Sequence, residues 1–299
     1  MPKLNVKQNN SNVIKAFQVA LETGHRNLLD NPWFTVNQRN FTTSTGVNNF
    51  YSVDRWYIAR GTGTISKTNN GITINGVGAS RETTFQQMID CGDLTGRTVT
   101  VSVNDGGTIR QITGTVPART TSNNIFIRFT LRDGVSAFLY AMATSSAYAY
   151  MLQFQVNAGY TIDLRAVKLE LGSYSTLAND VPPDYGEELR KCQRYFVRIA
   201  SSANAFPVGF GLKDSATVAD IFVPTPVEMR VTPSTSKSGV HRVWGGNAAS
   251  RDVSSYSTVA KITTGVYLRA TIASGSLADY YTYVLYLQNG AYIDLSADL

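Results

Sequence analysis

Short runs of alternating apolar and polar residues, separated by turn-forming residues, fill most of this 299-residue chain. The alternation is clear in the strings VTVSV (99–103) and IFIRF (125–129). Successive side chains of a β-strand point to opposite faces, so this pattern places one face of each strand in a core. Clusters such as NDGG (104–107) supply turns between the strands. Many short strands with regular turns are typical of sandwiches and jelly rolls, so the sequence predicts an all-β fold.

The chain is longer than one typical domain, and its middle has the features of a joint between two modules. Residues 164–172 (LRAVKLELG) have the pattern of a strand that closes a core. A polar, proline-bearing linker with a short helical turn follows at 173–191, and a fresh alternating strand covers 193–199. We therefore predict two jelly-roll-like β-sandwich modules in tandem, at residues 28–172 and 192–299.

The first 27 residues differ from the rest of the chain. Residues 1–11 are polar, whereas apolar residues recur every three to four positions between Asn12 and Gly24, which predicts an amphipathic helix. Its apolar face contains Val13, Ile14, Phe17 and Leu21. A helix this short is marginal alone in water, so its apolar face must pack on its own module, a sister chain or a larger particle. We interpret residues 1–27 as an extended segment followed by an anchoring helix.

Several classes of function lack support in the sequence. The net charge of +6 comes from basic residues scattered along the chain, without the basic stripe of a nucleic-acid-binding protein. There is no long apolar stretch, so we expect neither a signal peptide nor insertion into a membrane. Cys91 and Cys192 fall in different modules and have no metal-binding spacing, so we expect free, buried thiols. We expect no metal and no cofactor.

Catalytic motifs are also lacking. The sequence has no GxSxG, HExxH or P-loop pattern. His25 and His241 are the only histidines, and we assign each a surface or capping role. The loosely grouped acids Glu82, Asp90 and Asp93 are interpreted as residues of turns and strand ends. We therefore expect a protein that is not an enzyme.

Aromatic residues are the best candidates for ligand contacts, because sugars present apolar C–H patches beside a hydroxyl rim. Trp33 and Trp56 lie inside apolar strings and are predicted to be core residues. Trp244 precedes two glycines, which predicts a turn, where its indole is either an exposed contact or packed at a subunit interface. Tyrosines also alternate across two faces of a strand near the C-terminus, so some of them can reach a receptor. The candidate ligand contacts are Trp244, Arg242, Tyr280 and Tyr281.

Several strings resemble, in their order along the chain, the tail fibres and receptor-binding appendages of bacteriophages. NLLDNPWF and DRWYIA resemble the opening of the carbohydrate-binding-module-like jelly rolls of these fibres, and AVKLELG resembles their last strand. EELRKCQRYF, ADIFVPTPVEMRVTPSTSKSG and the terminal AYIDLSADL resemble their distal domains, which are often trimeric tips. Residues 1–27 match no pattern of this family.

The resemblance implies a structural virion protein, assembled in the host cytoplasm without a signal peptide. A tail fibre or spike of this kind forms a homotrimer and adheres to host glycan or protein through its distal β modules. From the amphipathic helix we expect residues 1–27 to attach it to other virion proteins. Repetition of weak contacts by symmetry would raise avidity. Two alternatives stay open: a head or collar decoration without receptor binding, and a glycan-degrading tailspike enzyme.

Overall fold

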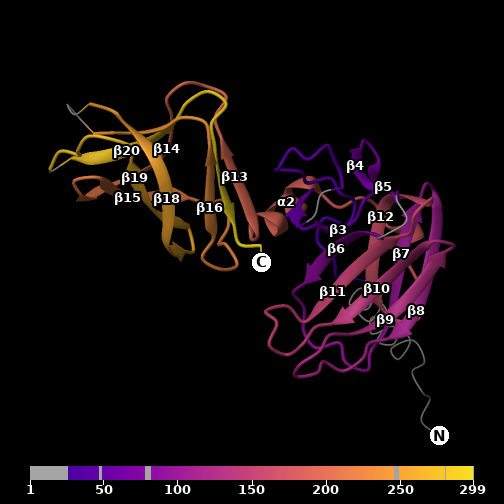
Figure 1. The fold of residues 1–299 in the computed structure, drawn as a ribbon. Helices are drawn as coiled ribbons and strands as arrows, with labels where there is room; N and C mark the ends of the chain where they lie inside the picture. The colour runs from indigo at the N-terminus through magenta and orange to yellow at the C-terminus, as the bar shows by residue number, and fades with distance from the viewer. Residues whose placement is uncertain (1–25, 47–48, 78–81, 246–248, 280, 299) are drawn as a thin grey trace, which may run out of the picture. The chain divides into compact units, whose positions relative to one another are not determined.

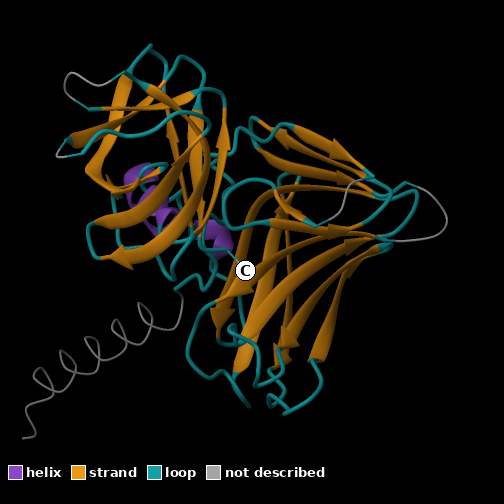
Figure 2. Ribbon diagram, turned by 60° about the vertical axis from the view of Figure 1, so that its left-hand side comes forward, coloured by secondary structure: helices purple, strands orange, loops and turns teal. Residues whose placement is uncertain are grey.

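The structure is a computed structural model that describes residues 26–298 except 47–48, 78–81, 246–248 and 280. Nearly all of its regular structure is β-strand, as Figure 2 shows. The chain divides into two compact units, Met1–Pro183 and Asp184–Leu299. The all-β, sandwich-type fold is therefore confirmed, and the boundary lies inside the segment predicted as a linker. The predicted anchoring helix, with Val13, Ile14, Phe17 and Leu21, lies outside the described residues.

The N-terminal unit consists of two six-stranded antiparallel sheets (Figure 1). In spatial order, the first sheet contains β1 (Thr43–Thr45), β4 (Thr64–Thr68), β5 (Gly71–Asn75), β12 (Thr161–Leu171), β7 (Thr98–Asp105) and β8 (Thr108–Thr115). The second contains β2 (Phe50–Tyr51), β3 (Tyr57–Arg60), β6 (Thr83–Ile89), β11 (Tyr150–Val156), β10 (Val135–Ala141) and β9 (Ile125–Arg132). Alternate side chains from both sheets form one apolar core.

Two neighbouring aromatic rings define the middle of this core. The indole of Trp56 is fully buried and stacks on Phe85, with 5.0 Å between ring centroids and 10° between ring planes. The core position predicted for Trp56 is therefore confirmed. The same prediction is wrong for Trp33, which is only partly buried. Trp33 adjoins Phe34, whose fully buried ring takes the core position next to Trp56, with 5.2 Å between the ring centroids.

The polar segment after β12 packs against the N-terminal unit. The Glu170 carboxylate accepts hydrogen bonds from the backbone N–H and the hydroxyl of Thr176, both at 2.9 Å. Lys168 Nζ contacts the Asp180 carboxylate at 2.6 Å. A short 3-10 helix, η1 (Leu177–Asn179), buries Leu177 between these contacts. The N-terminal unit consequently extends to Pro183, beyond its closing strand.

The C-terminal unit begins with α2 (Tyr185–Gln193), whose first turn is capped by the Asp184 carboxylate accepting from Glu187 N at 3.0 Å. A three-stranded sheet follows the order β13 (Phe196–Ala200), β21 (Tyr292–Ser296) and β16 (Ser234–Ser238). The other six strands close into an antiparallel barrel. In spatial order they are β14 (Phe206–Ser215), β15 (Val218–Pro224), β19 (Gly265–Ile272), β18 (Arg251–Ile262), β17 (His241–Trp244) and β20 (Thr282–Leu287).

The barrel interior is filled by every second residue of its strands. Ile221 and Val223 of β15 are fully buried, as are Val266 and Leu268 of β19. Because side chains alternate along a strand, the residues between them must face outward. The candidate functional surface consists of such outward-facing residues.

Candidate functional site on the barrel exterior

Outward-facing apolar residues line up across five strands of the barrel. The strand register places Trp244 opposite Val284, Val284 opposite Phe210, Phe210 opposite Phe222, and Phe222 opposite Tyr267. We call these four aromatic residues, together with Val284, the aromatic row. Its rings contact one another, with centroids 5.9 Å apart for Phe210 and Phe222 and 5.5 Å apart for Phe222 and Tyr267. Cross-strand neighbours at this spacing hold each other in a fixed orientation.

The aromatic row is unusually exposed for apolar residues. The exposed fraction is 58% for Phe210, 43% for Trp244 and 40% for Tyr267. A contiguous apolar surface of this kind is a mark of a binding or assembly site. Since the core of the same strands is already filled, the row contributes little to folding of the barrel.

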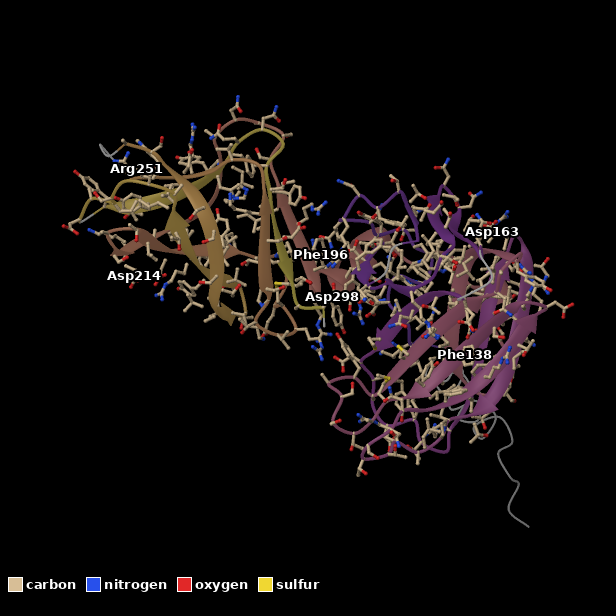
Figure 3. The ribbon with its side chains drawn as sticks, in the orientation of Figure 1. Phe138, Asp163, Phe196, Asp214, Arg251 and Asp298 are labelled. Carbon is tan, nitrogen blue, oxygen red and sulfur yellow. The ribbon has the colours of Figure 1, made fainter. Side chains whose placement is uncertain are left out.

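Charged residues lie two positions further along the same strands. The Arg269 guanidinium donates to both carboxylate oxygens of Asp220, at 2.9 and 3.0 Å, and lies 3.6 Å from Asp214. The hydrogen bonds that Arg269 donates to Asp220 raise the pKa of Arg269 above its ordinary value. Asp214, labelled in Figure 3, adjoins Lys213, whose ammonium lies 2.6 Å from Asp279. The aromatic row is therefore bordered by hydrogen-bonding groups that are held in place by ion pairs.

Two open hollows lie beside these charges, and the first of them also adjoins the aromatic row. The first, of about 540 Å³, is lined by Phe210, Phe222 and Tyr267 on one side and by Asp214 and Asp220 on the other. The second, of about 620 Å³, shares Lys213 and Asp214 with the first and extends to Asp279 and Tyr281. Both volumes fall in the range of small-ligand sites. Apolar rings and polar groups consequently meet in the first hollow.

The sequence-predicted contacts occupy two separate places on this unit. Trp244 is the last residue of β17, not a residue of a turn, and its ring lies 6.5 Å from that of Tyr286. Arg242 of the same strand forms an exposed ion pair with Asp252, with 2.7 Å between Nε and Oδ1. Tyr281 lines the second hollow, five residues before Tyr286. Trp244 and Arg242 therefore lie on one strand, whereas Tyr281 lines a hollow that neither of them lines. Tyr280 lies outside the described residues.

His241 contradicts the surface role assigned to it. It is the first residue of β17 and its exposed fraction is 1%. Its Nε2 lies 2.9 Å from the carbonyl oxygen of Ser238, which can only accept, so Nε2 carries the proton. Nδ1 then accepts from the Tyr256 hydroxyl at 2.9 Å. Burial lowers the pKa of His241, so the neutral ring is a structural element at neutral pH. His25 lies outside the described residues.

Phe210, Phe222 and Tyr267 were not identified from the sequence. The sequence feature that could have identified them is an aromatic residue on the outer face of a strand whose inner face is apolar, as in ADIFVP around Phe222. A strand buried on both faces has the same pattern. The sequence therefore could not show that this second face is exposed.

The acids near the end of β6 have structural roles. The Asp93 carboxylate accepts from the Thr95 backbone N–H at 2.9 Å and from the Tyr150 hydroxyl at 2.8 Å. These hydrogen bonds lower the pKa of Asp93 to about 2, which does not suit a proton donor at neutral pH. Within the described residues, no cluster of three or more His, Cys, Asp or Glu side chains has the arrangement of a metal site. None of the described helices has the length and apolar character needed to cross a membrane.

No protein-family model, curated protein or solved structure matches this chain. Any assignment of function therefore depends on the residues and geometry described above.

Proposed function

We propose that this chain is a structural, non-enzymatic protein of a bacteriophage particle, a tail fibre or spike that adheres to host-surface glycan through its C-terminal barrel. It attaches to other virion proteins through residues 1–27 and acts as a homotrimer assembled in the host cytoplasm. The ordered strings that resemble phage appendages support the assignment to a virion. The exposed aromatic row beside fixed charges is the observation that supports adhesion.

The chemistry of the row suits a pyranose ring. Phe210 and Tyr267 offer exposed ring faces that can cover the apolar C–H patches of a sugar. Asp214 and Asp220 border the same hollow and can accept hydrogen bonds from the hydroxyl rim. Neighbouring cations already engage both carboxylates, so their oxygens are held in position before a ligand arrives.

The hollow is open, so one contact of this kind is weak. Three copies carried by one trimer would engage a repetitive surface glycan together, and multivalent engagement raises avidity by about 10²–10⁴ over a single site. We therefore expect millimolar affinity for the single site and tight adhesion of the trimer. Mass measurement of the full chain at micromolar concentration should give a trimer, and a stable monomer would exclude this arrangement.

Replacement of Phe210 tests the adhesive role. On an array of neutral oligosaccharides of glucose, galactose and N-acetylglucosamine, the full chain should bind at least one member. Phe210→Ser should weaken that binding by about tenfold, which corresponds to about 1.4 kcal/mol. Its stability should change by less than about 1 kcal/mol, because the side chain is 58% exposed.

Phe206→Ser is the matched control. Phe206 begins the same strand, is 47% exposed, and lines neither hollow. It should therefore leave binding unchanged. Equal binding by the wild type and Phe210→Ser would contradict the proposal, as would failure of the wild type to bind any array member. If Phe210→Ser instead converted a trimer to monomers, the row would be a contact between subunits, and the adhesive role would be wrong.

A further inference from the structure

A separate hollow of about 520 Å³ lies on the N-terminal unit and has a different composition. Its lining combines one indole, two cations and two asparagines with a threonine. Pro182 completes the lining of the hollow, and the other residues come from the loop after Pro32, from the end of β4 and the turn that follows it, and from β12. They are Trp33, Thr35, Lys67, Asn69, Asn70 and Arg165.

The loop that carries Trp33 is held by a buried asparagine. The side chain of Asn31 donates to the carbonyl oxygens of Val36 and Asp54, at 2.8 and 2.9 Å, and accepts from Val36 N at 3.0 Å. Asn31 and Phe34 both have left-handed backbones, with φ of 49° and 57°. This tight turn buries the Phe34 ring completely and leaves Trp33 at the surface. The indole is consequently displayed by a rigid support.

The cations are brought together by close packing of a turn against β12. A Cβ at Gly71 would lie 2.0 Å from the carbonyl oxygen of Leu164, so the β4–β5 turn needs glycine at this position. The register of β12 shifts next to Arg165, whose Nε lies 3.2 Å from an oxygen of Asp163 (labelled in Figure 3). The end of β4 and the turn after it therefore place Lys67, Asn69 and Asn70 in the same hollow as Arg165.

The two cations differ in how well their charge is balanced. Asp163 forms an ion pair with Arg165, whereas Lys67 forms none with the residues that the structure describes. The Lys67 ammonium donates to the Thr68 carbonyl oxygen. Burial lowers the pKa of Lys67, which shows that its charge has lost part of its hydration. A carboxylate that entered the hollow would restore this lost stabilisation.

We propose that this hollow binds a single acidic sugar unit of an anionic saccharide, of the uronate or sialate class. The Trp33 ring covers the apolar face of the sugar, and Lys67 and Arg165 bind its carboxylate. Asn69, Asn70 and Thr35 hydrogen-bond its hydroxyls. A nucleic acid fits this site less well, because a nucleic-acid groove needs a row of cations along the backbone, and here Asp163 already neutralises one of two. The site lies on the other unit from the aromatic row, so it does not depend on the proposed function.

Binding of acidic oligosaccharides by the full chain tests this inference. The probes are a hyaluronan tetrasaccharide, a tetragalacturonate and sialyllactose, each with its carboxyl-reduced form as the uncharged counterpart. We expect the chain to bind at least one acidic probe, and reduction of the carboxyl to weaken that binding by about tenfold. Trp33→Ala and Lys67→Gln should each weaken it by about tenfold as well, with the thermal transition of the N-terminal unit monitored to verify folding.

Two control variants complete the experiment. Arg97→Gln removes an exposed positive charge of the same unit outside the hollow, and Phe210→Ser disables the aromatic row of the other unit. Neither should change binding of the acidic probe. The inference is wrong if no acidic probe binds at 10 mM, on the order of the weakest affinity expected for one sugar unit. It is also wrong if Arg97→Gln weakens binding as much as Lys67→Gln, or if a folded Trp33→Ala variant binds normally. If Phe210→Ser abolished binding instead, the sugar would belong to the barrel.

Discussion

Substitution of Asn31 tests how the loop that displays Trp33 is stabilised. Two separate effects act at this residue: three side-chain hydrogen bonds, and a left-handed backbone with φ of 49°. Asn31→Gly removes the hydrogen bonds, but glycine adopts the left-handed backbone without strain. Asn31→Ala removes the same bonds and keeps a Cβ, and alanine adopts the left-handed backbone at a cost because it lacks the local hydrogen bonds of asparagine.

The expected losses follow from these terms. Three buried hydrogen bonds at about 1 kcal/mol each give a loss of about 3 kcal/mol for Asn31→Gly. The left-handed backbone adds about 1 kcal/mol for Asn31→Ala, for a total of about 4 kcal/mol. Asn37 is the matched control, because its side chain also forms hydrogen bonds within its own loop, to the backbone of Phe41, but its backbone is not left-handed. There the order should be reversed, with alanine more stable than glycine.

Urea unfolding measures these differences. Trp244→Phe serves as the background, so that fluorescence reports Trp33 and Trp56 of the N-terminal unit alone. The free energy of unfolding should fall in the order wild type, Asn31→Gly, Asn31→Ala. Equal stability of the two Asn31 variants would refute the backbone argument. A loss below about 1 kcal/mol in both would refute the hydrogen-bond argument.

The buried titratable groups lead to two further expectations. Because burial holds the pKa of His241 below its ordinary value of 6.5, the unfolded chain binds a proton more readily than the folded one. The melting temperature of the C-terminal unit should therefore fall as the pH drops below about 6.5. His241→Gln should remove this dependence, and an equal fall of the melting temperature with pH in the variant would contradict the argument. Burial, with Asp90 and Asp93 nearby, raises the pKa of Cys91 to about 11, and Cys192 is fully buried. Iodoacetamide at pH 8 should thus alkylate the native thiols at least about tenfold more slowly than the thiols of the urea-unfolded chain. Equal rates would show that the native thiols are accessible.

The exposed or buried state of individual aromatic residues was the weakest part of the sequence prediction. Trp33 and Trp56 lie in similar apolar strings, yet only Trp56 joins the core. Both strings contain left-handed residues, Asn31 and Phe34 around Trp33 and Arg55 before Trp56, and a single sequence does not reveal these conformations. Phe222 was missed for a related reason, since outward-facing and doubly buried residues have the same alternation in a strand.

His241 and Trp244 show the same limit on a short strand. The glycines after Trp244 suggested a turn, but β17 pairs with β20 on one side and with β18 on the other. Pairing on both sides extends the strand to Trp244 and directs His241 inward. The contacts with β20 join residues that are at least forty positions apart, so no local pattern encodes them.

Alternating residues and turn clusters were enough to determine the all-β class, because period-two burial is a local property of a strand. The two-unit organisation could also be predicted from the sequence, because the polar segment after β12 interrupts that alternation. Only the tertiary structure decided which strands close into the barrel and which second faces stay exposed. Strand order and register are fixed by contacts between distant segments, and those contacts assemble both the aromatic row and the hollow at Trp33.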